Sequence, residues 1–583
     1  MLLRTTLAAL LVFGLLPSAG QQAPPAPAAP SAAAAPVASK TGLVVSSSDI
    51  ASDVGASILA KGGNAVDAAI ATAFALAVTH PTAGNLGGGG FMVVRMADGK
   101  TTSFDYREMA PGKSTPTMYL GDDGNIVAAR TATGYLAPGV PGTVRGMALA
   151  HKRLGKLAWK DLVTPAADLA EKGFAMSAAL ARGLSGEVSR GMQPYPASVA
   201  AYGKPGGGAW AAGDRLVLPD LAKTMKAIAA DGPDAFYMGW IADAIAKDMA
   251  ANGGLITKAD LAAYQAKERE TVNGTFLGYD IISMPPPSSG GTAVIEMLNM
   301  LEALKIQDKP RGSAEAVHLV TEARRRAYLD RARFLGDPDF GDVPVAKLTS
   351  KAHALEVIKT VDMNQASSSV ELGKDILTVT LPAESDETTH FSVLDKDGMA
   401  VSNTYTLEGG YGSHVVIAGT GVLLNNEMGD FNKKPGTTDL SGNIGTKPNL
   451  IAPGKRMLSS MTPTIVARGG KVVLITGSPG GRTIINTVLD VVLGVTAWKL
   501  SGREAVDGPR MHHQWLPDRL TIESGGVTPE VLAKLKVMGH NANMPATGGR
   551  QGSAQSIWID EKTGMAYGIA DTRDATAKAS KAQ

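Results

Sequence analysis

The chain has 583 residues, of which 44% are hydrophobic and 19% are charged, and it contains no cysteine. This composition is that of a globular chain, long enough for several domains or for one large α/β core. With 56 Lys and Arg against 54 Asp and Glu, the charge balance offers no strong field for nucleic acid or an anionic membrane. The lack of cysteine excludes disulfides, thiolate nucleophiles and cysteine-bound metal clusters.

The N-terminus carries the features of an export signal. Arg4 is followed by the uninterrupted apolar run Leu7–Leu16 and by the small residues Ser18-Ala19-Gly20, which predicts a cleavable signal peptide over residues 1–20. An uncleaved membrane anchor is the alternative, but the run is shorter than the roughly 20 residues that span a bilayer. Residues 21–40 alternate Pro and Ala with almost no charge, so we expect an extended tether there and no transmembrane span.

Helical and strand patterns alternate along the rest of the chain. The first part is rich in helical apolar spacing, including most of residues 155–275, and the last third is rich in alternating strands. This interleaving indicates one shared α/β body. The predicted helices are 50–61, 65–78, 159–172, 219–230, 234–252, 291–304 and 484–495, and the predicted strands are 91–96, 102–106, 281–284, 388–394, 400–407, 464–467 and 472–476.

Several catalytic patterns are missing from the chain. Its nine histidines include no His-Glu-x-x-His motif and no pair four residues apart, so a zinc site has little support. The glycine-rich run Asn85–Gly90 is followed by no Lys-Ser or Lys-Thr, which favours close backbone packing over a phosphate loop. The segment Thr476–Gly481 resembles a nucleophile elbow, but a threonine replaces its first glycine and Pro479 changes the turn.

The most informative segment lies around Thr388. The polar, acidic stretch Pro382–Glu387 leads directly into an alternating strand that begins at this threonine. If the peptide bond before Thr388 were cut, the new α-amino group, with a free pKa near 8, could act as base for the adjacent hydroxyl. The local pattern is also satisfied by a threonine that only begins an edge strand. It leaves both interpretations open.

A set of ordered motifs resembles the γ-glutamyltranspeptidase family and favours the first interpretation. The blocks occur in family order and at family-like spacing, so that the resemblance extends over nearly all of residues 41–575. They are Gly62–Ala69, Asp105–Pro111, Pro141–Val144, Met284–Gly291, Leu335–Phe340, Thr388–Val393, Thr404–Leu407, Leu423–Met428, Leu458–Thr464, Gly477–Gly481 and His512–Pro517.

The resemblance implies a fold, a maturation step and a set of reacting groups. The expected fold is a four-layer αββα N-terminal nucleophile hydrolase sandwich made of two subunits cut from one precursor. The cut would fall between Glu387 and Thr388, giving a large subunit over residues 41–387 and a small subunit over 388–583. Thr388 would be the nucleophile for processing and turnover, and Thr406 would orient it. The backbone amides of Gly480 and Gly481 match the oxyanion hole.

Other matched residues imply recognition of an amino-acid head group. Arg107, Ser459 and Ser460 match the clamp on the substrate α-carboxylate, for which a fork of donors suits a planar anion. Glu427 and Asp430 match the acidic partners of the substrate α-ammonium. His512-His513 invites a catalytic role, but an α-amine would already supply the base, so we expect these histidines to be structural.

Two positions depart from the commoner family pattern. Glu408 stands where many members have asparagine; a carboxylate can still accept from an ammonium, so we expect an altered pH dependence. The segment Phe431–Pro453 has the length of a loop that covers the pocket, but it contains no tyrosine. Ser441 lies near the place of the expected aromatic gate, which predicts a pocket more open to bulky acceptors or water.

These residues together predict a periplasmic or secreted enzyme that cleaves γ-glutamyl amides such as glutathione through a γ-glutamyl-Thr388 ester. Its partners would be this glutathione-like donor and an amino acid, peptide or water acceptor, with no cofactor, metal, nucleic acid or membrane span. A glutaryl-type acylase of the same fold is the alternative enzyme, although its substrate lacks the ammonium that Glu427 and Asp430 would hold. A non-catalytic envelope binding protein is the alternative outside the enzymes.

Overall fold

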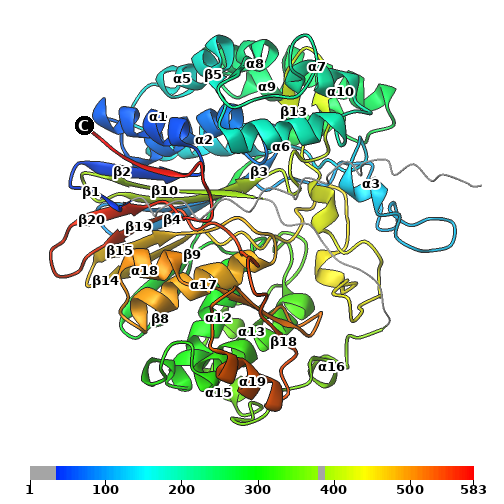
Figure 1. Cartoon of the computed structure of the whole chain (residues 1–583). Helices are drawn as coiled ribbons and strands as arrows, with labels where there is room; N and C mark the ends of the chain where they lie inside the picture. The colour runs from blue at the N-terminus through cyan, green and yellow to red at the C-terminus, as the bar shows by residue number, and fades with distance from the viewer. Residues whose placement is uncertain (1–34, 379–387) are drawn as a thin grey trace, which may run out of the picture. The chain divides into compact units, whose positions relative to one another are not determined.

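The computed structural model describes residues 35–378 and 388–583. Two seven-stranded antiparallel sheets lie face to face, and helices cover the outer face of each (Figure 1). The first sheet has the order β21-β2-β10-β11-β3-β4-β7 and the second β1-β20-β19-β15-β14-β9-β8. This is the expected αββα sandwich.

The strands of the two sheets come from both ends and the middle of the chain. The first sheet consists of β21 (Lys578–Lys581), β2 (Gly42–Ser46), β10 (Thr389–Asp395), β11 (Ala400–Thr406), β3 (Gly89–Arg95), β4 (Thr101–Asp105) and β7 (Lys267–Arg269). The second consists of β1 (Val37–Ser39), β20 (Ala566–Ile569), β19 (Ser556–Ile559), β15 (Lys471–Thr476), β14 (Thr464–Arg468), β9 (Tyr279–Ser283) and β8 (Val272–Phe276).

Alternation along the central strands explains why both faces of a sheet are buried. On β3, Met92 and Val94 belong to the core under the first helical layer, whereas Phe91 and Val93 belong to the core shared with the second sheet. Because successive side chains of a strand point to opposite faces, one strand contributes to two cores. The central strands are therefore apolar on both sides, as a sheet in the middle of a sandwich requires.

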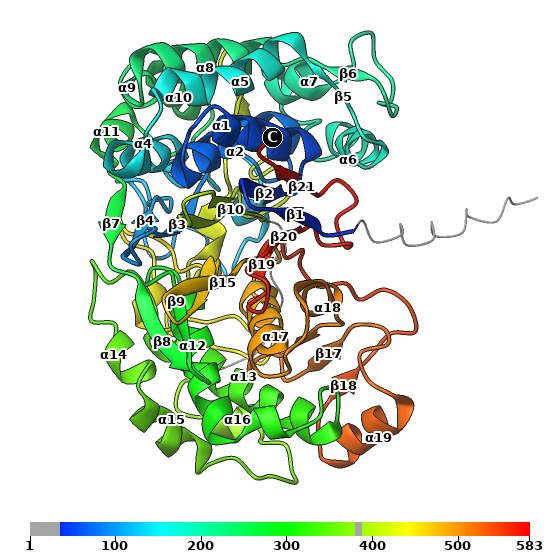
Figure 2. The same cartoon turned by 90° about the vertical axis from the view of Figure 1, so that its left-hand side faces the viewer.

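The helices divide between the two outer layers, as both views show (Figures 1 and 2). The layer on the first sheet includes α1 (Asp49–Ala60), α2 (Ala65–Thr79), α4 (Thr143–Leu154), α5 (Trp159–Lys172), α6 (Ala178–Ser189), α7 (Pro196–Tyr202), α8 (Pro219–Asp231) and α10 (Trp240–Ala251). The layer on the second includes α12 (Gly290–Ala303), α13 (Ala314–Phe334), α15 (Lys351–Ile358), α17 (Thr483–Thr496) and α18 (Gly502–Asp507). Helix α19 (Pro529–Val537) packs against α13.

Local sequence explains where the buried helix α2 begins. Asn64 accepts a hydrogen bond from the Asp67 N–H at 3.0 Å, and the Asp67 carboxylate accepts one from the Asn64 N–H at 3.0 Å. This capping box satisfies two of the amide donors that a helix start leaves unpaired. Every residue of α2 is buried, as the run of alanine, valine and isoleucine predicts for a helix between α5 and the first sheet.

Most predicted elements are confirmed, and three predictions need correction. The predicted helix 234–252 is two helices, α9 (Asp234–Tyr237) and α10, separated at Met238-Gly239. Strands β7 and β8 lie within the stretch predicted as mostly helical. Strand β1 lies within the predicted tether and pairs with β20, so folded chain begins before residue 41.

The predicted signal peptide, residues 1–20, and the predicted cleavage-site residue Glu387 lie outside the described residues. Among the residues that are described, no helix is both long and apolar enough to cross a membrane.

Candidate active site

The predicted nucleophile lies at the edge of the central hairpin. Thr388 directly precedes β10, and Thr406 ends the neighbouring strand β11, whose Tyr405 pairs with Thr389. The two threonines therefore lie at the same end of one antiparallel ladder. The Thr406 hydroxyl accepts a hydrogen bond from the Glu408 N–H at 2.8 Å, which fixes its orientation. Thr388 is only 6% exposed, yet it lines two adjoining cavities.

A histidine two residues after Thr388 has no role as a base at neutral pH. Burial lowers the pKa of His390 to about 3. Its ring nitrogens contact the hydroxyls of Thr404 at 2.8 Å and Ser392 at 3.1 Å. A Cβ on Gly477 would overlap the same ring, so His390 packs the strand pair against the loop that carries the predicted oxyanion hole.

That loop positions two glycine amides at the start of helix α17. Gly480 has φ +125° and Gly481 has φ +52°, conformations that glycine adopts readily and residues with a side chain rarely do. The Gly480 carbonyl accepts from the Thr483 N–H at 2.9 Å. Neither glycine N–H donates a hydrogen bond to any described residue. Together with the positive end of the helix dipole, these amides can stabilise an oxyanion beside Thr388.

Arg107 lines the smaller of these two cavities, the first cavity, and is fully buried. Its Nη1 lies 2.6 Å from Glu427 Oε2, and its Nη2 pairs with Asp430. The guanidinium also donates to the Met457 carbonyl at 3.3 Å. Glu108 follows Arg107 in the sequence, an arrangement that is more typical of a surface ion pair. The structure has that contact at 3.4 Å, but inside the core and beside the other two acids.

Burial and mutual repulsion set the protonation of this cluster. Burial raises the pKa of Glu427 well above its usual value, against the attraction of Arg107, and the negative charges of Glu108, Asp430 and Glu408 raise it further. Burial likewise raises the pKa of Glu108 to about 8. Because a zwitterionic amino-acid head group carries both signs of charge, it can pair its carboxylate with the arginine and its ammonium with the acids.

The two predicted serines also line the first cavity. The Ser459 carbonyl accepts from the Ser289 N–H at 2.8 Å and from the Ser289 hydroxyl at 2.6 Å, so the segment after β9 supports them. The Ser460 hydroxyl accepts from Arg331 Nη2 at 3.1 Å. This leaves hydroxyl and guanidinium donors directed at one small volume, which suits a carboxylate.

Glu408, which stands where many family members have asparagine, lines the first cavity. This position is what the predicted effect on the pH dependence requires. Its backbone has φ +76°, a left-handed conformation in which asparagine is more common than glutamate. Its carboxylate packs against Gly429: a Cβ there would come within 2.5 Å of Oε1 and 2.6 Å of Oε2. The absence of a side chain at residue 429 therefore makes room for the longer acid at residue 408.

The structure brings together the predicted residues that the sequence scatters over nearly 400 positions. The first cavity, of about 40 Å³, is lined by Thr388, Thr406, Arg107, Glu408, Glu427, Asp430, Ser459, Ser460 and Gly481. Gly480 lies on the second cavity, which shares Thr388 with the first. Of the predicted site, Glu387 alone lies outside the described residues.

Sequence reasoning missed several of the residues that line the first cavity and part of the role of the covering segment. Arg331, Asn449 and Arg482 line the first cavity; Asn449 donates to the Asp430 carbonyl at 2.7 Å and so holds that acid in place. The neighbouring Ser441 lies on the second cavity, so the predicted covering segment borders both spaces. Only the tertiary fold could reveal Arg331, since it lies in the last turn of the long helix α13, outside the matched motifs.

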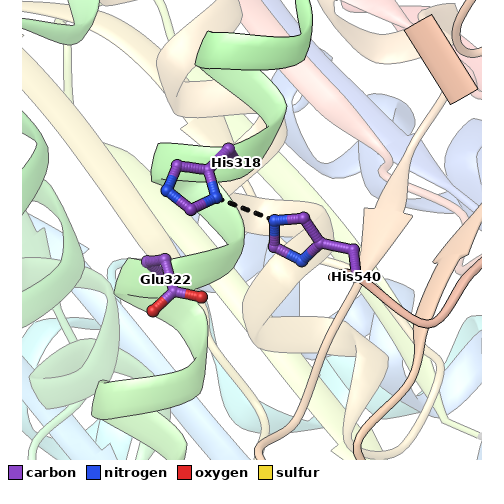
Figure 3. Close-up of side chains that lie close together, drawn as sticks. All are labelled: His318, Glu322 and His540. Atoms are coloured by element: carbon purple, nitrogen blue, oxygen red, sulfur yellow. Dashed lines mark hydrogen bonds between the residues drawn. The ribbon is translucent and has the colours of Figure 1, made fainter. Parts of the chain in front are cut away.

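Two clusters away from the cavities contain groups that bind metals elsewhere, and neither donor set suits a cation. His318 Nδ1 and His540 Nε2 are 2.8 Å apart beside Glu322 (Figure 3). Glu322, however, already pairs with Arg325 at 3.3 Å and Arg326 at 2.5 Å, and two guanidiniums repel an added cation.

In the second cluster His353 pairs with Asp330 at 3.1 Å and Glu296 at 3.5 Å. Hydrogen bonds to these two acids raise the pKa of His353 to about 9. At neutral pH the imidazolium therefore supplies the positive charge that balances the carboxylates.

Comparisons with known proteins agree with this arrangement. The model of the family described as gamma-glutamyltranspeptidase matches residues 51–580. The glutathione hydrolase proenzyme of Escherichia coli is 47% identical over 92% of this chain and 91% of its own. A crystal structure of cephalosporin acylase from Bacillus halodurans superposes with a TM-score of 0.82 at 25% identity, covering 96% of this chain and 98% of its own. The gamma-glutamyltranspeptidase of Helicobacter pylori is 45% identical with a TM-score of 0.54, covering 55% of this chain and 91% of its own.

Proposed function

The chain belongs to the γ-glutamyltranspeptidase family, and from this premise we infer that Thr388 is the N-terminal nucleophile with which it acts as a γ-glutamyltransferase and glutathione hydrolase. The single observation that carries the assignment is the cavity in which Thr388, a buried arginine, three acids and two serines converge. We further propose that the precursor cuts itself before Thr388, which separates a large subunit, residues 41–387, from a small subunit, residues 388–583.

The proposed reaction proceeds through an ester. The Thr388 hydroxyl attacks the γ-carbonyl carbon of the donor, and the α-amine of the same residue takes the hydroxyl proton. The amides of Gly480 and Gly481 stabilise the negative oxygen of the tetrahedral intermediate. When the intermediate collapses, the carbon–nitrogen bond breaks and the α-ammonium returns its proton to the leaving amine. Water or a second amine then attacks the γ-glutamyl ester and regenerates the threonine.

The α-amino and α-carboxylate groups of the donor hold its γ-carbonyl in reach of Thr388. In this proposal Arg107, Ser459 and Ser460 bind the carboxylate, while Glu427 and Asp430 bind the ammonium. Because Arg107 already lies 2.6 Å from Glu427, the two halves of the clamp are positioned before the substrate arrives. Such preorganisation lowers the entropic cost of binding.

The acylase alternative is favoured by one observation, the fold that the chain shares with the cephalosporin acylase. A glutaryl group carries no ammonium, so it would leave Glu427 and Asp430 facing an apolar methylene. The donor ammonium would add charge-assisted hydrogen bonds to these acids, each worth about 1.5 to 3 kcal/mol, and a glutaryl donor forgoes them. The acid pair therefore supports a γ-glutamyl donor over a glutaryl one.

Export is proposed on sequence grounds. The basic residue, apolar run and small residues over residues 1–20 fit a signal peptide, so we propose that the enzyme works in the periplasm or outside the cell. There it would meet glutathione-like donors together with amino acid or peptide acceptors.

Two chromogenic donors that differ only in the α-ammonium test the assignment. The enzyme should hydrolyse γ-glutamyl-4-nitroanilide with a kcat/KM about 100-fold or more above that for glutaryl-4-nitroanilide. Thr388→Ala should abolish turnover of both donors, whereas Thr389→Ser, which changes the next residue of the same strand, should keep it. Equal turnover of the two donors would favour the acylase, and no turnover of either would favour a binding protein.

A further inference from the structure

One guanidinium outside the set of predicted residues is linked to both serines of the carboxylate clamp. Arg331 lies in the last turn of α13 and lines the first cavity. Its Nη2 donates to the Ser460 hydroxyl at 3.1 Å, and its Nε donates to the Ser289 hydroxyl at 2.9 Å. The Ser289 hydroxyl in turn donates to the Ser459 carbonyl at 2.6 Å. Arg331 is therefore linked to Ser460 directly and to Ser459 through one intermediate.

The contacts of the two clamp serines determine how their hydroxyls can act. The Ser460 oxygen accepts from Arg331, and the Ser459 oxygen accepts from the Met461 N–H at 3.1 Å. Within the part of the chain that the structure describes, neither hydroxyl donates a hydrogen bond. A serine hydroxyl has a single hydrogen, and a lone pair occupied by a protein donor leaves that hydrogen to a ligand. Both serines are thus oriented as donors, which is what a carboxylate requires.

The charge of Arg331 strengthens the donor on Ser460. A hydrogen bond from a charged donor is roughly twice as strong as one between neutral groups. It also polarises the hydroxyl that accepts it, so that this hydroxyl donates more strongly to the next group of the chain. Ser460 therefore binds an anion more strongly than a serine without a guanidinium behind it.

Neighbouring helices fix the turn of α13 that carries Arg331. The preceding residue, Asp330, pairs with His353 of α15 at 3.1 Å, and His353 lies 3.5 Å from Glu296 of α12. Both carboxylates are buried. Because this cluster joins α12, α13 and α15, the last turn of α13 cannot move without breaking buried charged contacts. The guanidinium is therefore in position before a ligand arrives, which lowers the entropic cost of binding.

We propose that Arg331 is a positioning residue of the carboxylate clamp. It orients the Ser460 hydroxyl, and through Ser289 the segment of Ser459, so that both serines donate to the α-carboxylate of the donor. Arg107 makes the direct ion pair with this carboxylate, and Arg331 acts through the serines. Two hydroxyls held as donors discriminate against a carboxamide, whose NH2 group cannot accept from them. The proposal rests on the function proposed above, because it requires a γ-glutamyl donor in the first cavity.

Two donors that differ at this one group test the proposal. γ-Glutamyl-4-nitroanilide and its α-carboxamide analogue share the α-ammonium, the γ-carbonyl and the leaving group. The carboxylate ratio is kcat/KM for the first donor divided by kcat/KM for the second, measured on the processed enzyme. Arg331→Gln should lower this ratio by about 10-fold or more, as expected when a hydrogen bond to a charged group is weakened. The loss should come mainly from a higher KM for the carboxylate donor, with kcat changed less than about threefold.

Arg331→Lys separates the position of the group from its charge. An ammonium keeps the positive charge but lacks the planar fork with which Arg331 contacts Ser460 and Ser289 together. This variant should therefore also lower the carboxylate ratio, by about threefold or more. Because it keeps the charge, it also provides the test if Arg331→Gln does not fold. A wild-type ratio in Arg331→Lys would overturn the proposal, since charge alone would then explain the effect.

A double-mutant cycle with Ser460→Ala tests whether Arg331 acts through that hydroxyl. In the Ser460→Ala background Arg331→Gln should lower the carboxylate ratio by less than about threefold, since no hydroxyl remains there to orient. Arg333→Gln is the matched control. It changes an arginine of the same helical turn that contacts Asp375 and the Leu372 carbonyl, and it should keep the wild-type ratio.

Failure of this proposal is distinguishable from failure of the proposed function. An unchanged carboxylate ratio in Arg331→Gln would overturn the positioning role. Equal losses with serine or alanine at residue 460 would also overturn it, because Arg331 would then bind the carboxylate directly. A loss of kcat/KM by the same factor for both donors, together with a lower unfolding temperature, would reduce Arg331 to a structural residue. A processed wild type that turns over neither donor would instead contradict the γ-glutamyl function.

Discussion

The contact between Glu408 and Gly429 yields a prediction about two residues at once. A Cβ on Gly429 would lie 2.5 and 2.6 Å from the oxygens of the Glu408 carboxylate. Since non-bonded atoms normally stay about 3.5 Å apart, Gly429→Ala must displace that carboxylate by about 1 Å. The displaced group is the end of a flexible side chain, so the change should alter the geometry of the site more than the stability of the fold.

The expected loss follows from the sensitivity of an active site to position. A displacement of about 1 Å can cost roughly 100-fold in rate, and we expect Gly429→Ala to lower kcat/KM for γ-glutamyl-4-nitroanilide by about 10- to 100-fold. The free energy of unfolding should fall by about 1 kcal/mol or less. In the Glu408→Asn background, where the side chain is one methylene shorter, the same substitution should cost less than about threefold, which gives a coupling energy of roughly 1 to 3 kcal/mol.

The assay is a double-mutant cycle of kcat/KM and thermal unfolding on the processed proteins. Gly341→Ala is a suitable control, since a Cβ there meets nothing within 4 Å and both measurements should remain unchanged. If Gly429→Ala lowers kcat/KM by the same factor with glutamate or asparagine at residue 408, the carboxylate does not occupy the position inferred for it.

Three further predictions concern charge. Arg107→Lys should raise KM and cost about 1.5 to 3 kcal/mol in kcat/KM, because an ammonium cannot replace the planar fork; steady-state kinetics will show it, and self-cleavage should persist. Glu408→Asn removes one of the charges that raise the pKa of Glu427, so the acid limb of kcat/KM against pH should move to lower pH, and superimposable limbs would exclude Glu408 from the site. Burial would raise the pKa of Glu322, but two neighbouring arginines more than offset this and lower it to about 2. Its contribution to stability is therefore present above about pH 4.5 and lost as the pH falls through 2, so Glu322→Gln should reduce the unfolding free energy at pH 7 by on the order of 3 kcal/mol and flatten this acid loss in denaturant titrations.

The local spacing of apolar residues was sufficient to predict those helices and strands in which buried residues recur at a regular period. Helix α2 and the hairpin of β3 and β4 match their predicted ranges because apolar spacing and turn residues specify them directly. The edge strand β7 escaped prediction, since Lys267-Glu268-Arg269 has no apolar alternation. It forms through tertiary pairing with β4 and an ion pair of 2.8 Å between Arg269 and Asp105.

The residues of the candidate site were predictable from the sequence, but their burial and ion pairing were not. Ordered motifs identified Thr388 and Arg107, and the structure brings both to one cavity. Sequence could not show that Arg107 is fully buried and directly paired with Glu427, because that contact joins residues more than 300 positions apart. The second cavity was likewise invisible: Arg519 and Arg550 lie in loops that have no motif, and only the fold places them on the wall of a cavity that Thr388 also lines.

The most direct test of the central claim is the intact mass of the purified protein, measured together with its turnover of γ-glutamyl-4-nitroanilide. We expect two chains in the active wild type, one of which has the mass of residues 388–583 and begins with Thr388. The Thr388→Ala variant should give one inactive chain without this cut. A wild-type preparation that is fully active while its chain remains intact across Glu387-Thr388 would contradict the N-terminal nucleophile mechanism.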